Sequence, residues 1–418
     1  MRAPVDLTSA AALRVIGPGI TIVAATYGLS RYTYGLFIPD FRAAFGLSTD
    51  WLGLIASSSY ASYLAATLLG SWLSSHTGPR LPIVLGGGCA ALGMFLIALA
   101  SSPAWLALGV IVAGASPGLS YPPLPDAVIQ LVSQRQQSRT YTIINSGTSL
   151  GVVLAGPLAL WAGQQWRLAW AGFAVFATAT TIWNIYVMPS GGVRHASSGL
   201  PRLRWRWLIK PQSHRLFLAA LALGLVTSVY WTFAVEYLVS AGTTDNSARI
   251  LASVGLPANA LPQAFWILIG VAGFAGAFAG DLVTQLGLRW SYRATVSLIA
   301  LAIAVLAATP TYPPGVLISA LVFGGTFIVA TALLGVWSVN VFYDRPSIGF
   351  GTTFFLLSLG QLISPAIAGV AAERVGLAPT FWVAAGCGLA MLALQPREDI
   401  RGMTPEAEDA AVQVETQY

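Results

Sequence analysis

The sequence predicts an all-α membrane protein with twelve transmembrane helices in two pseudo-symmetric six-helix bundles. Its composition is the first observation: 56% of the 418 residues are hydrophobic and only 9% are charged, against about 25% charged residues in ordinary soluble domains. Second, the apolar residues form continuous runs, unlike the alternating segments of about ten residues in a membrane barrel. Helices are therefore expected to satisfy the backbone in lipid. Third, features of the chain repeat at half its length.

The expected helices follow from the apolar runs, because a bilayer core needs about 20 mostly apolar residues per helix. Twelve runs meet this requirement: 16–42, 50–73, 81–101, 104–130, 140–162, 168–188, 215–240, 263–284, 290–309, 313–341, 347–371 and 378–396. They divide the chain into an N-terminal bundle (1–188), a basic linker (189–214), a C-terminal bundle (215–396) and an acidic tail (397–418).

The loop charges predict the orientation. With the N-terminus inside, sixteen Lys and Arg residues lie in inner loops and four in outer loops. This asymmetry predicts cytoplasmic N- and C-termini in the cell inner membrane. The linker contains the run Arg202–Trp207, which favours a segment at the membrane surface, with a specific anionic-lipid site as the alternative. The basic residues thus indicate topology and lipid contact, and no nucleic-acid partner is expected.

Other function classes have little support. Cys89 and Cys387 lie within apolar runs, and the histidines, His76, His195 and His214, are scattered in inner loops. We therefore expect no metal site and no cofactor. The chain has no glycine-rich nucleotide loop with a Lys-Ser/Thr pair, which argues against direct ATP drive. A membrane enzyme or a non-transporting sensor is a remote alternative, and we expect a monomer.

An internal repeat separates the two halves. After the second span the chain reads Ser71–Arg80, and after the eighth it reads Gly280–Arg289, with Leu, Gly and Arg matching at an offset of 209. Gly151 of the fifth span and Gly360 of the eleventh share the same offset. A duplication of six helices plus six, joined by a basic loop, is typical of transporters whose site lies between the halves.

These features resemble the major facilitator superfamily along almost the whole chain. The loop after the second span is similar to that family's signature, Gly-x-Leu-x-Asp-Arg-x-Gly-Arg-Arg, of which Leu73, Gly78 and Arg80 remain. Ser75 stands in place of the signature Asp, so the carboxylate of the usual charge relay is missing. The arginine of the family's fourth span is also absent, with Val110 at its expected place.

Two further motifs refine the resemblance. The fifth span reads Gly147-x-x-x-Gly151-x-x-x-x-Gly156-Pro157, similar to the Gly-Pro motif often seen in exporters of the family. The first span contains Arg31-Tyr32-x-Tyr34, which resembles the bacterial YbfB/YjiJ-type branch. The resemblance implies that spans 1, 4, 7 and 10 line a central cavity. It also implies conformational roles for a set of residues in the signature loop and in spans 5 and 8: Gly78, Arg80, Gly151, Gly156, Pro157, Gly276 and Gly280.

The small residues of spans 5 and 8 permit close helix approach. Gly147-x-x-x-Gly151 and Gly276-x-x-x-Gly280 are the two motifs concerned. In the resembled fold these spans face each other across the halves, so the motifs form either a sliding seam between the halves or contacts within one half.

Arg31 is the most informative residue, because a charge inside lipid costs about 2.5–3.5 kcal/mol on insertion scales. It lies about 15 residues into the first span, which at about 1.5 Å per residue is past the midplane. One interpretation is that its guanidinium faces the cavity and binds an anionic substrate group through a bidentate fork. The alternative is that it pairs with Asp40, Glu236 or helix carbonyls and holds an outer gate.

Several aromatic and amide side chains are candidates for the same cavity. Tyr27 and Tyr34 fall at i−4 and i+3 from Arg31, on its helical face. The full set of substrate-binding candidates combines these with residues of spans 4, 5, 7, 10 and 11: Arg31, Tyr27, Tyr34, Tyr121, Tyr230, Trp231, Trp337, Asn340, Asn145 and Gln361. For any single aromatic, packing or an interfacial position is the alternative.

The predicted function is secondary active transport of a small organic anion or amphipathic compound by alternating access. Proton coupling is left open, and it would need a carboxylate that responds to the cavity. Glu236, flanked by apolar residues, is the first candidate, followed by Asp40 and Asp126. Asp126 follows a Pro-Pro-x-Pro run that should break the fourth span. The competing function is a drug-type proton antiporter, which the Gly-Pro motif favours.

Overall fold

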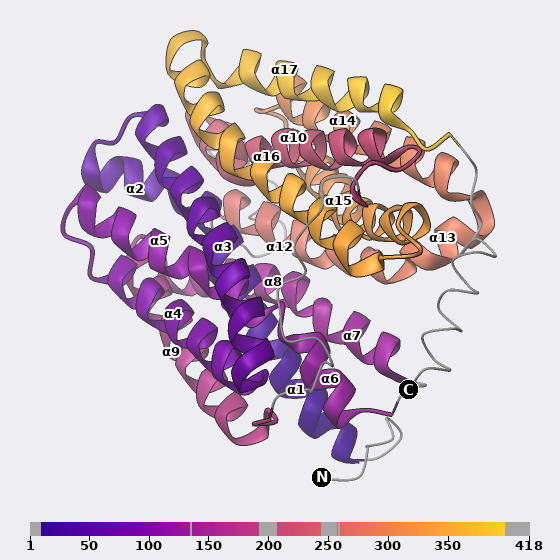
Figure 1. Ribbon diagram of the computed structural model, residues 1–418. Coiled ribbons are helices and arrows are strands. Elements are labelled where there is room, and N and C mark those ends of the chain that lie inside the picture. The colour runs from indigo at the N-terminus through magenta and orange to yellow at the C-terminus, as the bar shows by residue number, and fades with distance from the viewer. Residues whose placement is uncertain (1–9, 134–135, 192–206, 244–256, 258–259, 398–418) are drawn as a thin grey trace.

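The computed structural model describes residues 10–133, 136–191, 207–243, 257 and 260–397, and every regular element in these ranges is a helix (Figure 1). Two groups of helices lie beside each other. One contains the indigo to magenta N-terminal part of the chain, and the other contains the rose to yellow C-terminal part (Figure 1). The all-α membrane fold predicted from the sequence is therefore confirmed.

The first segment of the chain changes helix type three times. It begins as α1 (Ala10–Val23), continues as the π-helix η1 (Ala24–Tyr32) and the 3₁₀-helix η2 (Thr33–Phe37), and ends as α2 (Ile38–Phe45). The Thr33 hydroxyl donates to the Gly28 carbonyl five residues earlier, at 2.8 Å. Short π segments occur frequently at functional sites, and this one contains Arg31.

The remaining N-terminal helices are α3 (Thr49–Thr77), α4 (Arg80–Ala98), α5 (Pro103–Ser120), α6 (Leu124–Leu131), α7 (Gln137–Asn145), α8 (Gly147–Ala162) and α9 (Trp166–Val187). The break between α5 and α6 falls at residues 121–123 and confirms the interruption expected from the proline run.

The C-terminal helices are α10 (Ser213–Ser240), α12 (Leu261–Gly273), η5 (Phe274–Phe278), α13 (Ala279–Leu286), α14 (Leu288–Ala308), α15 (Pro313–Val341), α16 (Pro346–Val375), α17 (Leu377–Ala390) and η6 (Met391–Leu394). A continuous core of buried apolar residues joins both halves, from Leu29 and Phe41 in the first segment to Phe323 and Phe381 in the C-terminal half.

Eleven helical stretches in the described part of the chain are long and apolar enough to cross a membrane, and some of them, such as Leu261–Leu286, join neighbouring elements. They correspond to the second to twelfth predicted spans. The first predicted span, 16–42, is divided among α1, η1, η2 and α2 and is not one of these eleven stretches. The total of twelve therefore stays a prediction.

Two helix pairs make the most extensive contacts across the halves, α3 with α16 and α8 with α12, and α10 also contacts η2 and α2. In the first pair, a Cβ on Gly369 would lie 2.7 Å from the Thr49 carbonyl oxygen, and one on Gly53 would lie 3.0 Å from the Pro365 carbonyl carbon. In the second, a Cβ on Gly270 would lie 2.7 Å from the Val153 nitrogen. Such close backbone contact requires glycine.

The predicted small-residue motifs do not form these seams. Gly147 and Gly151 pack against backbone carbonyls of α1 and η1, in their own half, and Gly276 packs against Ile328 of α15, also in its own half. Nothing lies within 4 Å of a Cβ placed on Gly280. The seam interpretation is therefore wrong for these four glycines, although α8 and α12 do face each other. Among the predicted glycines, Gly156 does lie at the α8–α12 seam. A Cβ on Gly156 would lie 2.9 Å from the Gln263 carbonyl oxygen.

Candidate functional site

Arg31 is buried at the contact between the two halves. Its residue is 6% exposed, and its Nη2 donates a hydrogen bond of 2.7 Å to Oε1 of Gln361. Gln361 lies in α16, so this bond joins the first segment of the chain to the C-terminal half. Both residues were predicted for the site, and the structure brings them together.

Four tyrosine rings surround the Arg31 guanidinium. Its Cζ lies 3.9 Å from the ring centre of Tyr63 and 4.8 Å from that of Tyr60, both in α3. The rings of Tyr27 and Tyr32 lie at 5.4 and 5.6 Å. Such contacts stabilise a cation by roughly 0.5–2 kcal/mol each. None of the ion pairs found among the described residues includes Arg31, so its charge is held by rings and an amide.

Three buried donors of this group lack an acceptor: Arg31 Nε, Gln361 Nε2 and Trp231 Nε1. Gln361 also lies near the Tyr32 hydroxyl, but its amide nitrogen makes no hydrogen bond of normal geometry. A cavity of about 10 Å³ adjoins Arg31, Tyr60 and Trp231, which is room for about one water molecule. The site is therefore rich in donors and closely packed.

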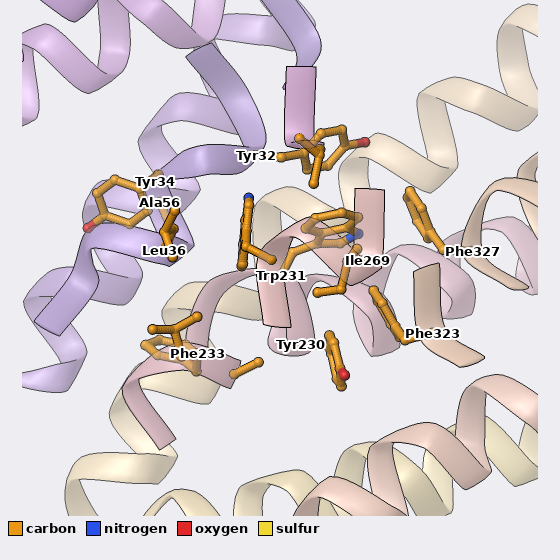
Figure 2. Close-up of a cluster of buried hydrophobic side chains, with 14 of the residues drawn as sticks. Tyr32, Tyr34, Leu36, Ala56, Tyr230, Trp231, Phe233, Ile269, Phe323 and Phe327 are labelled. Atoms are coloured by element: carbon orange, nitrogen blue, oxygen red, sulfur yellow. The ribbon is translucent and has the colours of Figure 1, made fainter. Parts of the chain in front are cut away.

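Tyr32 forms an aromatic layer with Trp231 and Phe327 of the C-terminal half (Figure 2). The rings of Tyr32 and Trp231 lie 4.4 Å apart, and Phe327 lies 5.4 Å from Trp231. Tyr34, which lines the same cavity, donates to the Leu52 carbonyl at 3.0 Å. This layer offers apolar surface next to the buried charge.

Polar groups continue from Arg31 on its other side. The hydroxyls of Tyr27 and Tyr63 lie 3.1 Å apart, and the Tyr121 ring lies 5.1 Å from that of Tyr27. The Tyr121 hydroxyl donates to Asn145 Oδ1 at 2.8 Å. These half-buried residues come from η1, α3, the α5–α6 break and α7. Three of the predicted candidates, Tyr27, Tyr121 and Asn145, thus form one connected group.

Other predicted candidates lie within the C-terminal half. Tyr230 hydrogen-bonds Ser319 at 2.7 Å and stacks on Phe323 at 3.8 Å, which agrees with the packing alternative. Trp337 packs edge-on against Tyr292 at 5.7 Å. Asn340 Nδ2 donates to the carbonyl of residue 336, one turn earlier, at 2.9 Å.

Tyr60 and Tyr63 were not predicted. Their separation of three residues places them on one helical face. This spacing was the sequence feature that could have indicated that both tyrosines line one site. The sequence did not indicate that this face of α3 turns toward Arg31.

Glu236 pairs with Arg42 and not with Arg31. The residue is 5% exposed, and its Oε1 lies 2.6 Å from Arg42 Nε in α2. The alternative in which Arg31 pairs with Glu236 is therefore wrong, because α10 packs against α2 and the carboxylate meets Arg42 there. Glu236 Oε2 is buried without a hydrogen-bond partner.

The Arg42–Glu236 pair belongs to a set of contacts between the halves. Arg42 Nη2 also donates to the Thr49 hydroxyl at 2.7 Å, and the Thr49 amide donates to Glu373 Oε2 at 2.9 Å. An open pocket of about 290 Å³ adjoins Arg42, Thr49 and Glu236. Two acids of the C-terminal half thus hold groups of the N-terminal half at this end of the molecule.

The remaining predicted acids lie apart from Arg31. Asp40 is partly buried in the first turn of α2. Asp126, in the first turn of α6, accepts from the Ser74 hydroxyl at 2.7 Å. It therefore contacts the loop that resembles the family signature. In that loop Gly78 has a positive φ of 83°, and Arg80 Nε donates to the Met188 carbonyl at 2.6 Å.

Two groups of membrane-crossing helices with a buried cation between them are typical of transporters whose site lies between two halves. The sequence family described as "Uncharacterised MFS-type transporter YbfB" matches residues 23–395. The chain belongs to this family, and the branch indicated by Arg31-Tyr32-x-Tyr34 is confirmed.

Known proteins agree with this assignment. Monocarboxylate transporter 13 of Rattus norvegicus is 25% identical over 88% of this chain and 83% of its own length. A bacterial homologue of the human lysosomal transporter Spinster, in an inward-facing and unoccupied conformation, superposes with a TM-score of 0.70, 13% identity and coverage of 97% of this chain and 98% of that one. The nucleoside transporter NupG superposes with a TM-score of 0.71, 11% identity and coverage of 91% and 98%. At these identities the structural likeness shows the fold.

Proposed function

We propose that this protein is a secondary transporter that carries a small organic anion, or an amphipathic compound with an anionic group, across the inner membrane. The observation that carries the proposal is Arg31, a guanidinium that is 6% exposed and held by tyrosine rings and an amide instead of a carboxylate. A buried charge without a counter-ion is costly. A substrate anion would supply the missing charge, and the guanidinium fork matches a carboxylate in geometry.

The surroundings favour an anion with an apolar part. The aromatic layer of Tyr32, Trp231 and Phe327 can hold a hydrocarbon or ring. A cationic substrate would be repelled by Arg31, since no described ion pair neutralises it. The name of the rat relative, a monocarboxylate transporter, is in line with this substrate class.

Alternating access follows from the same geometry. The α3–α16 seam is closely packed at Thr49, which accepts a hydrogen bond from Arg42, so this seam is packed at the end that holds the Arg42–Glu236 pair. We infer from the loop charges that this end faces outside and that both chain termini lie in the cytoplasm. The described state is then closed to the outside. The fold similarity to an inward-facing transporter supports this assignment.

Proton coupling would use an acid at a moving contact. Glu236 is our first candidate, because its carboxylate is buried and its partner Arg42 belongs to the other half. Opening of this end would separate the pair and leave Glu236 free to take up a proton. Asp40 and Asp126 are the alternatives.

The test is ligand binding by purified protein, measured as thermal stabilisation. The compounds are acetate, benzoate and indole-3-acetate, each compared with its uncharged amide. Arg31→Lys keeps the charge and loses the fork, so the affinity for the carboxylates should fall at least tenfold while the unliganded melting temperature is kept. Arg293→Lys, at an arginine that lies 4.6 Å from the Trp290 ring, is the matched control and should bind normally. A folded Arg31→Ala variant that binds carboxylates like the wild type would refute the proposal.

A further inference from the structure

We infer that the anionic group of the substrate is a carboxylate that binds both halves at once, taking hydrogen bonds from Arg31 of the N-terminal half and from Gln361 and Trp231 of the C-terminal half. This inference rests on the proposed function and specifies the hydrogen bonds that two of the predicted binding residues, Gln361 and Trp231, give to the anionic group. The observation behind it is the shortage of acceptors around Arg31.

Each of the three residues has a buried donor that makes no hydrogen bond of normal geometry within the protein. Arg31 Nε, Gln361 Nε2 and Trp231 Nε1 all lack an acceptor. Buried donors without partners are rare, because each has lost its hydrogen bond to water. Three such donors in one group that contains a cation favour a ligand that accepts hydrogen bonds and donates none. An ionised carboxylate fits, because it has two oxygens, about four lone-pair sites and no donor.

The orientation of the Gln361 amide follows from Arg31. A guanidinium only donates, so the amide oxygen must face it, as the bond of 2.7 Å from Nη2 to Oε1 shows. The amide nitrogen is then turned away and remains available. In the described state the Gln361 carbonyl thus acts as a neutral substitute for a substrate oxygen.

The cavity beside Arg31 is smaller than the proposed ligand. Its volume of about 10 Å³ holds about one water molecule and is too small for a carboxylate with a carbon chain. Binding would therefore move the Gln361 side chain off the guanidinium and widen the space between Arg31 and Trp231. The carboxylate would then replace the single Arg31–Gln361 bond between the halves with several charge-assisted bonds, and this would favour the occluded state.

Gln361→Glu tests the inference directly, because it places a permanent carboxylate where the amide oxygen already contacts Arg31. We expect the unliganded melting temperature to rise by about 2–4 °C and sodium benzoate to give no further rise. Asn184→Asp is the matched control. Asn184 is also a fully buried amide, but its contacts are backbone carbonyls of residues 18 and 180, so this acid should lower the melting temperature.

Trp231→Phe supplies a second, milder test, since it keeps a ring and removes only the N–H donor. We expect benzoate affinity to fall about three- to tenfold, in keeping with the loss of one hydrogen bond, while benzamide binding stays unchanged. Adding Arg31→Leu to Gln361→Glu should turn the gain in melting temperature into a loss, because the new carboxylate then has no cation.

The outcomes separate this inference from the proposed function. If benzoate stabilises the wild type and equally stabilises Gln361→Glu, the bridging carboxylate is wrong while anion binding at Arg31 stands. If Gln361→Glu lowers the melting temperature as much as Asn184→Asp does, the inference is likewise refuted, whatever the wild type binds. If no carboxylate stabilises the wild type and Arg31→Lys changes nothing, the proposed function itself fails.

Discussion

Replacing Glu236 by Gln should shift the protein toward a state that is open at the Arg42 end. The substitution preserves the shape of the side chain and removes its charge. Arg42 belongs to α2 and Glu236 to α10, so their ion pair at 2.6 Å acts between the halves and exists only while this end is closed.

The size of the shift can be estimated from the geometry. At 2.6 Å and an effective dielectric constant of about 20, two unit charges attract by about 6 kcal/mol. The Arg42 side chain is 36% exposed, so water screens much of this attraction, and exposed pairs yield only about 0.2–1 kcal/mol. Between these limits we expect about 1.5–3 kcal/mol. This corresponds to about a ten- to hundredfold change in the ratio of closed to open states.

The assay is a distance measurement between spin labels on the exposed residues Trp51 of α3 and Val375 of α16, at the same end of the seam. Both native cysteines, Cys89 and Cys387, are first replaced by Ala. Glu236→Gln should add a longer component to the distance distribution, because α3 and α16 separate when this end opens.

Asp344→Asn is the control for the loss of an ion pair as such. It removes the ion pair of 2.8 Å between Asp344 and Lys210. Lys210 precedes α10 and Asp344 precedes α16, so this pair does not join the two halves. The distribution should then remain that of the parent protein. If Glu236→Gln also leaves the distribution unchanged, the Arg42–Glu236 pair does not hold the halves together and our reasoning about this end is incorrect.

Three further predictions concern the seam, the coupling and the topology. Gly53→Val should prevent close packing of α3 on α16 and reduce transport more than tenfold, whereas Gly88→Val, with nothing within 4 Å of its Cβ, should transport normally; equal activities would exclude a tight seam. Glu236→Gln should abolish accumulation driven by a pH gradient and spare substrate exchange in vesicles, and full accumulation would assign coupling to another group. A cysteine at Ser198, outside the described residues, should react with impermeant reagents only from the cytoplasm; labelling from outside would reverse the topology.

The sequence by itself indicated that the chain lies in a lipid bilayer, that it spans the bilayer with helices, and that Arg31 is the residue most worth testing. Charge is scarce and apolar runs are long, and both properties can be read without knowing any contact. Arg31 stood out for the same reason, since a cation in a membrane span is costly wherever the helix packs. Gln361 was recognised as a polar residue within a span, but its partner was not.

The partners depended on tertiary structure. Gln361 is 330 residues from Arg31, and helical periodicity relates only residues of one helix. The face argument for the first segment also assumed a regular α-helix. The π-helix Ala24–Tyr32 adds residues to the turn, and Tyr32 lies against both Arg31 and Trp231.

The acidic sites show the same limit. Glu236 was chosen for its apolar neighbours in sequence, and it is buried. Its partner is nevertheless Arg42, because the packing of α10 against α2 decides which cation it meets. The pairs Gly147/Gly151 and Gly276/Gly280 of spans 5 and 8 matched a small-residue pattern, yet the close contacts between the halves use Gly53, Gly156, Gly270 and Gly369. Spacing reveals which residues permit close approach, but only the mutual placement of two helices determines where that approach occurs.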